Sequence, residues 1–185
     1  MPLFRKFSSV TFRTSVMMKW HGRTLVSLIF TLLAAAGALH AQENPHVSWK
    51  VLTPTLTGRP GDVVELKVQA VIKSGWKMYS TRTYPETLEW GSPQPTEITV
   101  GDSLLLARVG DVKGTKPGTS YDAGFEIDTE YWKGSPTIII PVRIARNARK
   151  GRTVEGWVNF YFQTCDETVC LPGMDRKLTF KVKVG

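Results

Sequence analysis

The amino-acid sequence predicts an all-β domain, a β-sandwich, because short alternating runs are separated by turn residues. Apolar and polar side chains alternate from Val63 to Ile72, as expected for a strand with one buried face. Gly, Pro, Asp and Asn interrupt the runs at the spacing typical of sandwich strands. No segment after residue 41 combines a helical period with helix caps. We therefore expect a sandwich of about eight strands.

The expected strands differ in how clearly their sequences show a strand pattern. The clearest patterns are Val63–Ile72, Thr137–Ile144, Thr153–Gln163 and Lys177–Val184. The weaker patterns are Trp49–Leu52, Lys77–Thr81, Glu97–Val100 and Leu104–Val109. Two segments are expected to be loops: Tyr84–Pro95, which contains three prolines, and Gly110–Phe125, which contains four glycines.

The first 41 residues have the features of a signal peptide. Arg23 precedes an apolar run from Thr24 to Leu39, and a small residue, Ala41, stands before polar sequence. The run is shorter than the roughly 20 apolar residues that span a bilayer, although an uncleaved anchor is the alternative. Translation is expected to begin at Met17 or Met18. Cleavage near Ala41 would release the exported protein.

Residues 42–185 are expected to form one domain with its own core. Five of the 24 basic residues and none of the 16 acidic residues precede residue 42. The exported chain therefore has 19 basic and 16 acidic residues, and its net charge is small. This balance argues against nucleic acid as a partner.

The two cysteines, Cys165 and Cys170, are the most informative residues of the exported chain. In an exported protein such a pair is either a structural disulfide or a redox site. A bridge that closes only six residues stabilises by about 2 kcal/mol in the entropic model, which makes it an inefficient staple. A non-catalytic sandwich for binding or assembly, with a structural disulfide, remains the alternative.

The residues between the cysteines differ from a thioredoxin centre. That centre places its cysteines at a helix N-terminus, which lowers the thiol pKa. Here Asp166 and Glu167 lie between the cysteines, and nearby carboxylates disfavour a thiolate. We therefore expect a guarded dithiol that reacts only inside a complex with its partner.

Other chemistries have little support in the sequence. His46 is the only histidine after residue 41, so neither a His-based triad nor a multi-histidine metal site is expected. There is no phosphate loop and no dinucleotide fingerprint. We expect no metal, no cofactor and no small-molecule substrate. Aromatic residues Trp90, Tyr131 and Trp132 permit a sugar-binding reading, but their spacing does not select it.

Three segments together resemble the N-terminal periplasmic domain of the thiol:disulfide interchange protein DsbD family. They are Gly75–Thr81 (GWKMYST), Pro93–Thr96 (PQPT) and Phe162–Pro172 (FQTCDETVCLP), and they occur in the order of that family. The resemblance implies an immunoglobulin-like β-sandwich with a redox-active cysteine pair. It also implies that Cys170 forms the mixed disulfide with a partner and that Cys165 resolves it.

The same resemblance implies the partners. A thioredoxin-like donor, fed by a membrane domain, would reduce the pair, and the acceptors would be periplasmic disulfide isomerases and thioredoxins of cytochrome c maturation. Because the sequence ends at Gly185 without membrane segments, we expect a stand-alone form with a separate membrane electron transporter. Gly173 departs from the family, in which a second proline is common after Pro172.

The family also has a cap loop that shields the disulfide with an aromatic side chain. The candidates here are Phe125 and Tyr121, with Asp122 beside them. The residues expected to flank the site are Tyr161, Gln163, Asp166, Glu167 and Pro172. A basic run from Arg143 to Arg152 reads as a solvated turn, with a membrane or partner contact as the alternative.

Overall fold

The computed structural model describes residues 44–85, 92–101 and 104–185. Residues 43–185 form one compact unit with its own hydrophobic core. The expected signal peptide, with Met17, Met18 and Ala41, lies outside the described residues, so it stays a prediction. In the part that the structure describes there is no helix long and apolar enough to cross a membrane.

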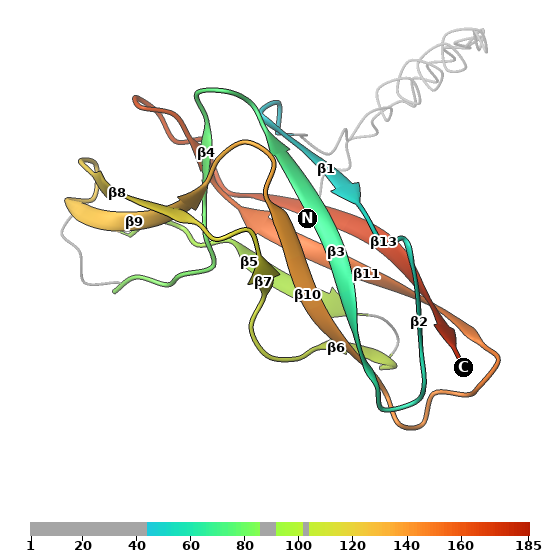
Figure 1. The fold of residues 1–185 in the computed structure, drawn as a ribbon. Helices are drawn as coiled ribbons and strands as arrows, with labels where there is room; N and C mark the ends of the chain where they lie inside the picture. The colour runs from blue at the N-terminus through green and yellow to red at the C-terminus, as the bar shows by residue number, and fades with distance from the viewer. Residues whose placement is uncertain (1–43, 86–91, 102–103) are drawn as a thin grey trace, which may run out of the picture. The chain divides into compact units, whose positions relative to one another are not determined.

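The described residues form an all-β sandwich, as the sequence predicts (Figure 1). The first sheet contains β1 (Val47–Val51), β3 (Val63–Ile72), β10 (Thr137–Ile144) and β6 (Leu106–Arg108), with β7 (Lys113–Gly114) also paired to β10. The second sheet contains β2 (Thr55–Gly58), β13 (Met174–Val184), β11 (Thr153–Phe162) and β5 (Glu97–Gly101). A third, smaller sheet contains β12 (Thr164–Cys165), β4 (Lys77–Tyr79), β9 (Ile127–Trp132) and β8 (Gly118–Asp122).

The core lies between the first two sheets and follows from the period of two along their strands. On β3 the inward residues include Leu66 and Val68, and on β11 they include Phe160 and Phe162, all 2% exposed or less. The Trp49 ring lies 4.3 Å from the Phe160 ring and joins the two layers. The core therefore anchors β11 firmly up to the point where the chain continues into the cysteine segment.

The expectation of a loop from Gly110 to Phe125 is wrong in part. This segment contains β7 and β8, and β8 pairs along its whole length with β9, a strand that the sequence did not indicate. No residue of β8 is fully buried. Main-chain hydrogen bonds to β9, rather than an apolar face, therefore hold this strand, which explains why its sequence lacks alternation.

The third sheet brings distant segments to the end of β11. β12 pairs with β4, so that Cys165 lies opposite Lys77, and β4 pairs with β9. The β8–β9 hairpin thus lies one strand away from the cysteine segment. This arrangement places the expected cap residues near the disulfide.

The disulfide hairpin and its cap as a candidate redox site

Cys165 and Cys170 form a disulfide at the tip of a tight hairpin. The two Cα atoms are 4.0 Å apart and the residues form an antiparallel bridge. The Asp166 N–H donates to the Val169 carbonyl at 3.0 Å, and the Leu171 N–H donates to the Thr164 carbonyl at 2.9 Å. Main-chain bonds thus close this turn on both sides of the sulfurs, in addition to the disulfide.

The Asp166 carboxylate organises the turn between the cysteines. Its Oδ1 accepts hydrogen bonds from the Thr168 N–H and the Val169 N–H, each at 2.8 Å, and from the Thr168 hydroxyl at 2.9 Å. These bonds lower the pKa of Asp166, and the bond from the Thr168 N–H has the largest effect. The carboxylate therefore stays ionised, and a negative charge stays beside the cysteines.

The two sulfur-bearing residues differ in exposure. Cys165 is 1% exposed because β12 is paired with β4 beneath the hairpin. Cys170 is exposed, and its neighbour Val169 is 50% exposed. An incoming thiolate therefore has access to Cys170 but not to Cys165.

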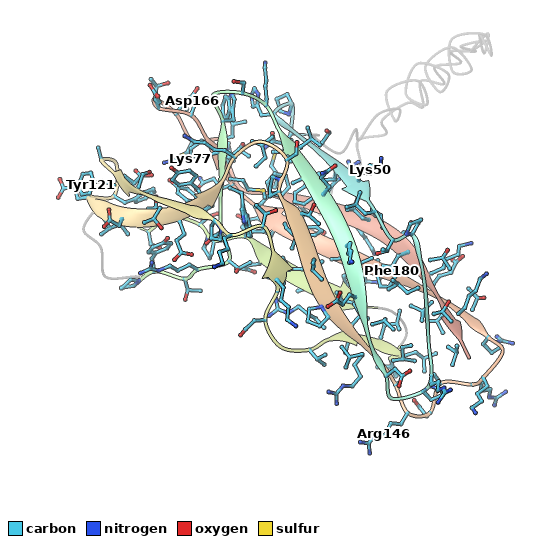
Figure 2. All side chains as sticks on the ribbon, in the orientation of Figure 1. Lys50, Lys77, Tyr121, Arg146, Asp166 and Phe180 are labelled. Atoms are coloured by element: carbon cyan, nitrogen blue, oxygen red, sulfur yellow. A yellow bond between two sulfur atoms is a disulfide. The ribbon has the colours of Figure 1, made fainter. Side chains whose placement is uncertain are left out.

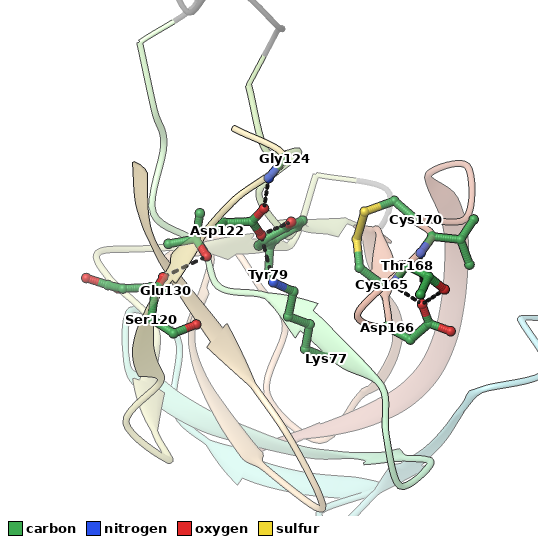
Figure 3. Close-up of polar contacts among 12 residues, drawn as sticks. Lys77, Tyr79, Ser120, Asp122, Gly124, Glu130, Cys165, Asp166, Thr168 and Cys170 are labelled. Carbon is green, nitrogen blue, oxygen red and sulfur yellow. Dashed lines mark hydrogen bonds and ion pairs between the residues drawn. A yellow bond between two sulfur atoms is a disulfide. The ribbon is translucent and has the colours of Figure 1, made fainter. Parts of the chain in front are cut away.

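Asp122 fastens the β8–β9 turn over this region. Its Oδ2 accepts hydrogen bonds from Lys77 Nζ at 2.7 Å and from the Tyr79 hydroxyl at 2.8 Å, and its Oδ1 accepts one from the Gly124 N–H at 3.1 Å. All three donors converge on the one carboxylate (Figure 3). Phe125 packs edge-on against the Tyr79 ring, with centroids 6.3 Å apart. We call Asp122–Phe125 the cap.

Protonation states favour this arrangement at neutral pH. Burial alone would raise the pKa of Asp122, but hydrogen bonds from Lys77 and Tyr79 and the Lys77 charge lower it overall. Burial, followed by the bond to Asp122, raises the pKa of Tyr79 well above its usual range. The carboxylate is therefore an anion and the phenol a neutral donor.

The cap and the hairpin face each other across an open cleft of about 540 Å³. Both cysteines, Asp166 and Glu167 line it from the hairpin, and the cap lines it from the other side. Tyr121, which is 64% exposed, lines it too. The expected flanking residues Tyr161, Gln163 and Pro172 do not line it; the Gln163 amide instead donates to the Leu171 carbonyl at 3.1 Å.

Sequence reasoning did not single out Lys77, and for Tyr79 it favoured packing within a strand over a place on a partner surface. Met78 and Tyr79 are indeed buried, but the Tyr79 hydroxyl and the Lys77 ammonium reach into the cleft. The sequence carried one signal, namely the Gly-Trp-Lys-Met-Tyr segment of the family resemblance. The alternating period of two could not identify the carboxylate partner, because Asp122 is 45 residues from Lys77.

Gly173 has a local explanation. A Cβ atom there would collide with the Tyr161 ring and hydroxyl and would lie 2.9 Å from Gln94 Oε1. The Tyr161 hydroxyl donates to that same oxygen at 2.8 Å. The glycine thus leaves room for the Tyr161–Gln94 bond, and a proline here would fill that room.

Replacing Gly173 by Ala is expected to lower the free energy of unfolding by about 1 kcal/mol or less, because the side-chain ends that it meets can move and one exposed hydrogen bond is lost. The added methyl group would displace Tyr161 and break its bond to Gln94. Urea denaturation measures the effect. In a Tyr161→Ala background the same change should cost almost nothing; an equal cost in both backgrounds would contradict the explanation.

A half-shielded disulfide at the edge of a β-sandwich, with a cap fastened across the cleft, is the arrangement of a thiol–disulfide exchange domain. The family model described as thiol:disulfide interchange protein DsbD, N-terminal, matches residues 47–181. The chain belongs to this family of periplasmic domains. A search of curated proteins finds no match.

Solved structures with a similar fold are distant in sequence. One is a cohesin from the scaffoldin B of Acetivibrio cellulolyticus, with 13% identity, 76% of this chain and 98% of that chain covered, and a TM-score of 0.40. Another is the major pilin GBS80 of Streptococcus agalactiae, with 11% identity, coverages of 77% and 57%, and a TM-score of 0.40. These likenesses carry no argument about fold or function; the sheet topology by itself defines the all-β sandwich.

Within the described residues no group of three or more His, Cys, Asp or Glu side chains could hold a metal ion.

Proposed function

We propose that the chain relays electrons between two thioredoxin-like proteins through the Cys165–Cys170 pair. One partner reduces the disulfide and the other is reduced by the resulting dithiol. The proposal places the protein in the periplasm after cleavage near Ala41, with a separate membrane transporter feeding the donor. Thioredoxins of cytochrome c maturation are candidate acceptors.

One observation carries the proposal: the unequal exposure of the two cysteines within a cleft. A purely structural bridge gains nothing from an exposed sulfur, whereas an exchange site needs one accessible and one sheltered sulfur. The turn is also closed by main-chain hydrogen bonds, so the disulfide adds little to its stability.

The exchange follows from this geometry. A thiolate of the reduced donor attacks the Cys170 sulfur, and the Cys165 sulfur leaves as a thiolate that takes up a proton. The second donor thiolate then attacks the donor sulfur of the mixed disulfide and releases Cys170. Two electrons have passed from donor to domain. The reverse sequence, with Cys170 attacking the acceptor disulfide and Cys165 resolving, passes them on.

The cap gives this exchange its selectivity. With Asp122 bonded to Lys77 and Tyr79, the β8–β9 turn narrows the approach to the sulfurs. A partner that displaces the cap breaks those bonds and leaves the Lys77 ammonium without its counter-ion in the same cleft as the sulfurs. An unpaired cation there favours a thiolate, so displacement of the cap both exposes and activates the pair.

The equilibrium reduction potential of the pair tests the proposal. We expect a value between about −120 and −270 mV, the range of exchange proteins, from thiol trapping in redox buffers. Replacing both cysteines by Ser should abolish electron transfer and leave the fold intact by circular dichroism. A potential below about −300 mV would instead indicate a structural bridge.

A further inference from the structure

The end of the sandwich opposite the disulfide is strongly basic. Six exposed basic residues come from the β2–β3 turn and from the end of β10 through the β10–β11 connection: Arg59, Arg143, Arg146, Arg149, Lys150 and Arg152. We call them the basic end. The segments are tied together, because the Gly61 N–H donates to the Ile144 carbonyl at 2.9 Å and the Gly151 N–H donates to the Val184 carbonyl at 2.7 Å.

The charge of the domain is concentrated there. Asp62 is the one carboxylate within the described β2–β3 turn, and residues 142–154 contain no Asp or Glu. Glu155 follows directly and lines the same cleft as Arg149 and Arg152, and its carboxylate is paired with Lys181 at 3.2 Å. The rest of residues 42–185 then has 13 basic and 15 acidic residues, a net negative charge. The opposite end includes Asp122, Asp166 and Glu167. The domain is therefore polarised along its strands, with the positive pole far from the sulfurs.

An exposed leucine, Leu104, precedes a residue that lines a cleft with two of these cations. Leu104, before β6, is 92% exposed and has a φ of 86°, which is unfavourable for a residue with a side chain. Its neighbour Leu105 accepts a hydrogen bond from the Ala145 N–H at 2.9 Å and lines a cleft of about 500 Å³ with Arg149 and Arg152. An exposed apolar side chain thus lies one residue along the chain from a cleft that two arginines line.

We propose that the basic end binds the surface of an anionic phospholipid membrane, with Leu104 entering the boundary between headgroups and acyl chains. Arginine and lysine side chains near such a surface are attracted by its negative potential. An adjacent apolar side chain strengthens this binding, because its transfer from water into the lipid phase is favourable. A soluble polyanion would use the arginines but would have no use for the leucine.

This orientation would present the redox site to soluble partners. β11 and β12 run from Thr153 at the basic end to Cys165, which is about 40 Å along an extended chain. Arg146 and Asp166 lie at opposite ends of the domain (Figure 2). The membrane would therefore hold the disulfide away from its surface, and the proposal does not depend on which proteins exchange electrons with it.

Co-sedimentation with vesicles tests the proposal. Residues 42–185 are used, because residues 43–185 are a compact unit and the apolar leader would bind lipid by itself. Binding is expected to vesicles of phosphatidylcholine with about one third phosphatidylglycerol, to weaken as salt rises, and to be absent with phosphatidylcholine alone. No binding to the anionic vesicles at low salt would overturn the proposal.

Two variants with matched controls locate the surface. Arg146→Gln with Arg149→Gln should reduce vesicle partitioning roughly 30-fold, because each basic residue contributes about fivefold. Lys113→Gln with Lys116→Gln removes the same charge from exposed positions near β7 and should change little. An equal loss in both double variants would mean that net charge alone drives binding, contrary to the proposal.

Leu104→Ser distinguishes a membrane from a soluble polyanion. It should weaken vesicle binding about tenfold, whereas Leu52→Ser, at a residue that is 39% exposed on another part of the surface, should not. If Leu104→Ser has no effect while the arginine variant loses binding, the basic end serves a soluble polyanion and the membrane proposal is wrong. All variants should keep the reduction potential of the unaltered domain.

Discussion

Cys165→Ser is expected to accumulate as a mixed disulfide with an oxidised thioredoxin-like protein, whereas Cys170→Ser is not. In the first variant the exposed Cys170 attacks the partner disulfide, and no second thiol is present to resolve the product. In the second variant the remaining thiol, Cys165, is 1% exposed in the native disulfide form and is therefore much harder for a protein partner to reach. Non-reducing electrophoresis and mass spectrometry should show at least a tenfold difference in trapped complex.

Unfolding provides the control for this comparison. In concentrated guanidinium chloride the two variants should react with an aromatic disulfide reagent at similar rates, because sequence alone then sets the environment of each thiol. A large difference between the two reaction rates that persists after unfolding would mean that the fold is not what makes the two thiols differ. Equal trapping by the two native variants would remove the distinction between attacking and resolving cysteines on which the relay rests.

The sequence predicted those strands whose side chains bury one face. Val63–Ile72 and Thr137–Ile144 coincide with β3 and β10, because alternation along a strand records which side chains enter the core. The β8–β9 hairpin was not predicted, since no residue of β8 is fully buried and its pairing depends on main-chain bonds. Strands at the edge of a small sheet bury few side chains, so their sequences show little alternation of apolar and polar residues.

The residues of the site also fall into two groups: some were predictable from the sequence, and others only the fold brings together. The cysteine hairpin is local, and its residues were evident from a continuous stretch of sequence. The contact between Lys77 and Asp122 depends on β12, β4, β9 and β8 assembling in that order, which no local pattern encodes. Family resemblance indicated the cap segment, and only the three-dimensional arrangement identified the cation and the phenol that hold it.

Asp122→Ala is expected to speed reduction of the disulfide by a phosphine reagent several-fold, because the cap narrows the approach to Cys170, which is already exposed when the cap is closed. The change removes the acceptor of the Lys77 and Tyr79 hydrogen bonds, and charge-assisted bonds contribute about 1.5–3 kcal/mol each. Losing them raises the population with the cap open, but the gain in rate is limited because the closed state already exposes Cys170. A phosphine is the right probe, because its attack does not require a protein thiolate.

A charge control accompanies this measurement. Phosphines of this kind carry carboxylates, so losing any nearby negative charge would favour their approach. Asp128→Asn removes one charge from an exposed position on β9 and should raise the rate less than twofold. If the two variants have equal rates, repulsion rather than cap closure protects the disulfide, and the closing role of Asp122 is wrong.

Acid should open the cap of the unaltered protein. The pKa of Asp122 in the folded state lies below its ordinary value of 3.8, so its contribution to cap closure is complete above pH 3.8 and is lost as pH falls through the lowered value. The reduction rate, divided by that of an unstructured disulfide peptide to correct for phosphine protonation, should stay flat from neutral pH to about 4 and rise below it.

Asp122→Asn has no carboxylate to protonate, so its ratio should be high and independent of pH throughout. A rise at the same pH in both proteins would assign the acid transition to another group, of which Asp166 in the hairpin turn is the nearest candidate.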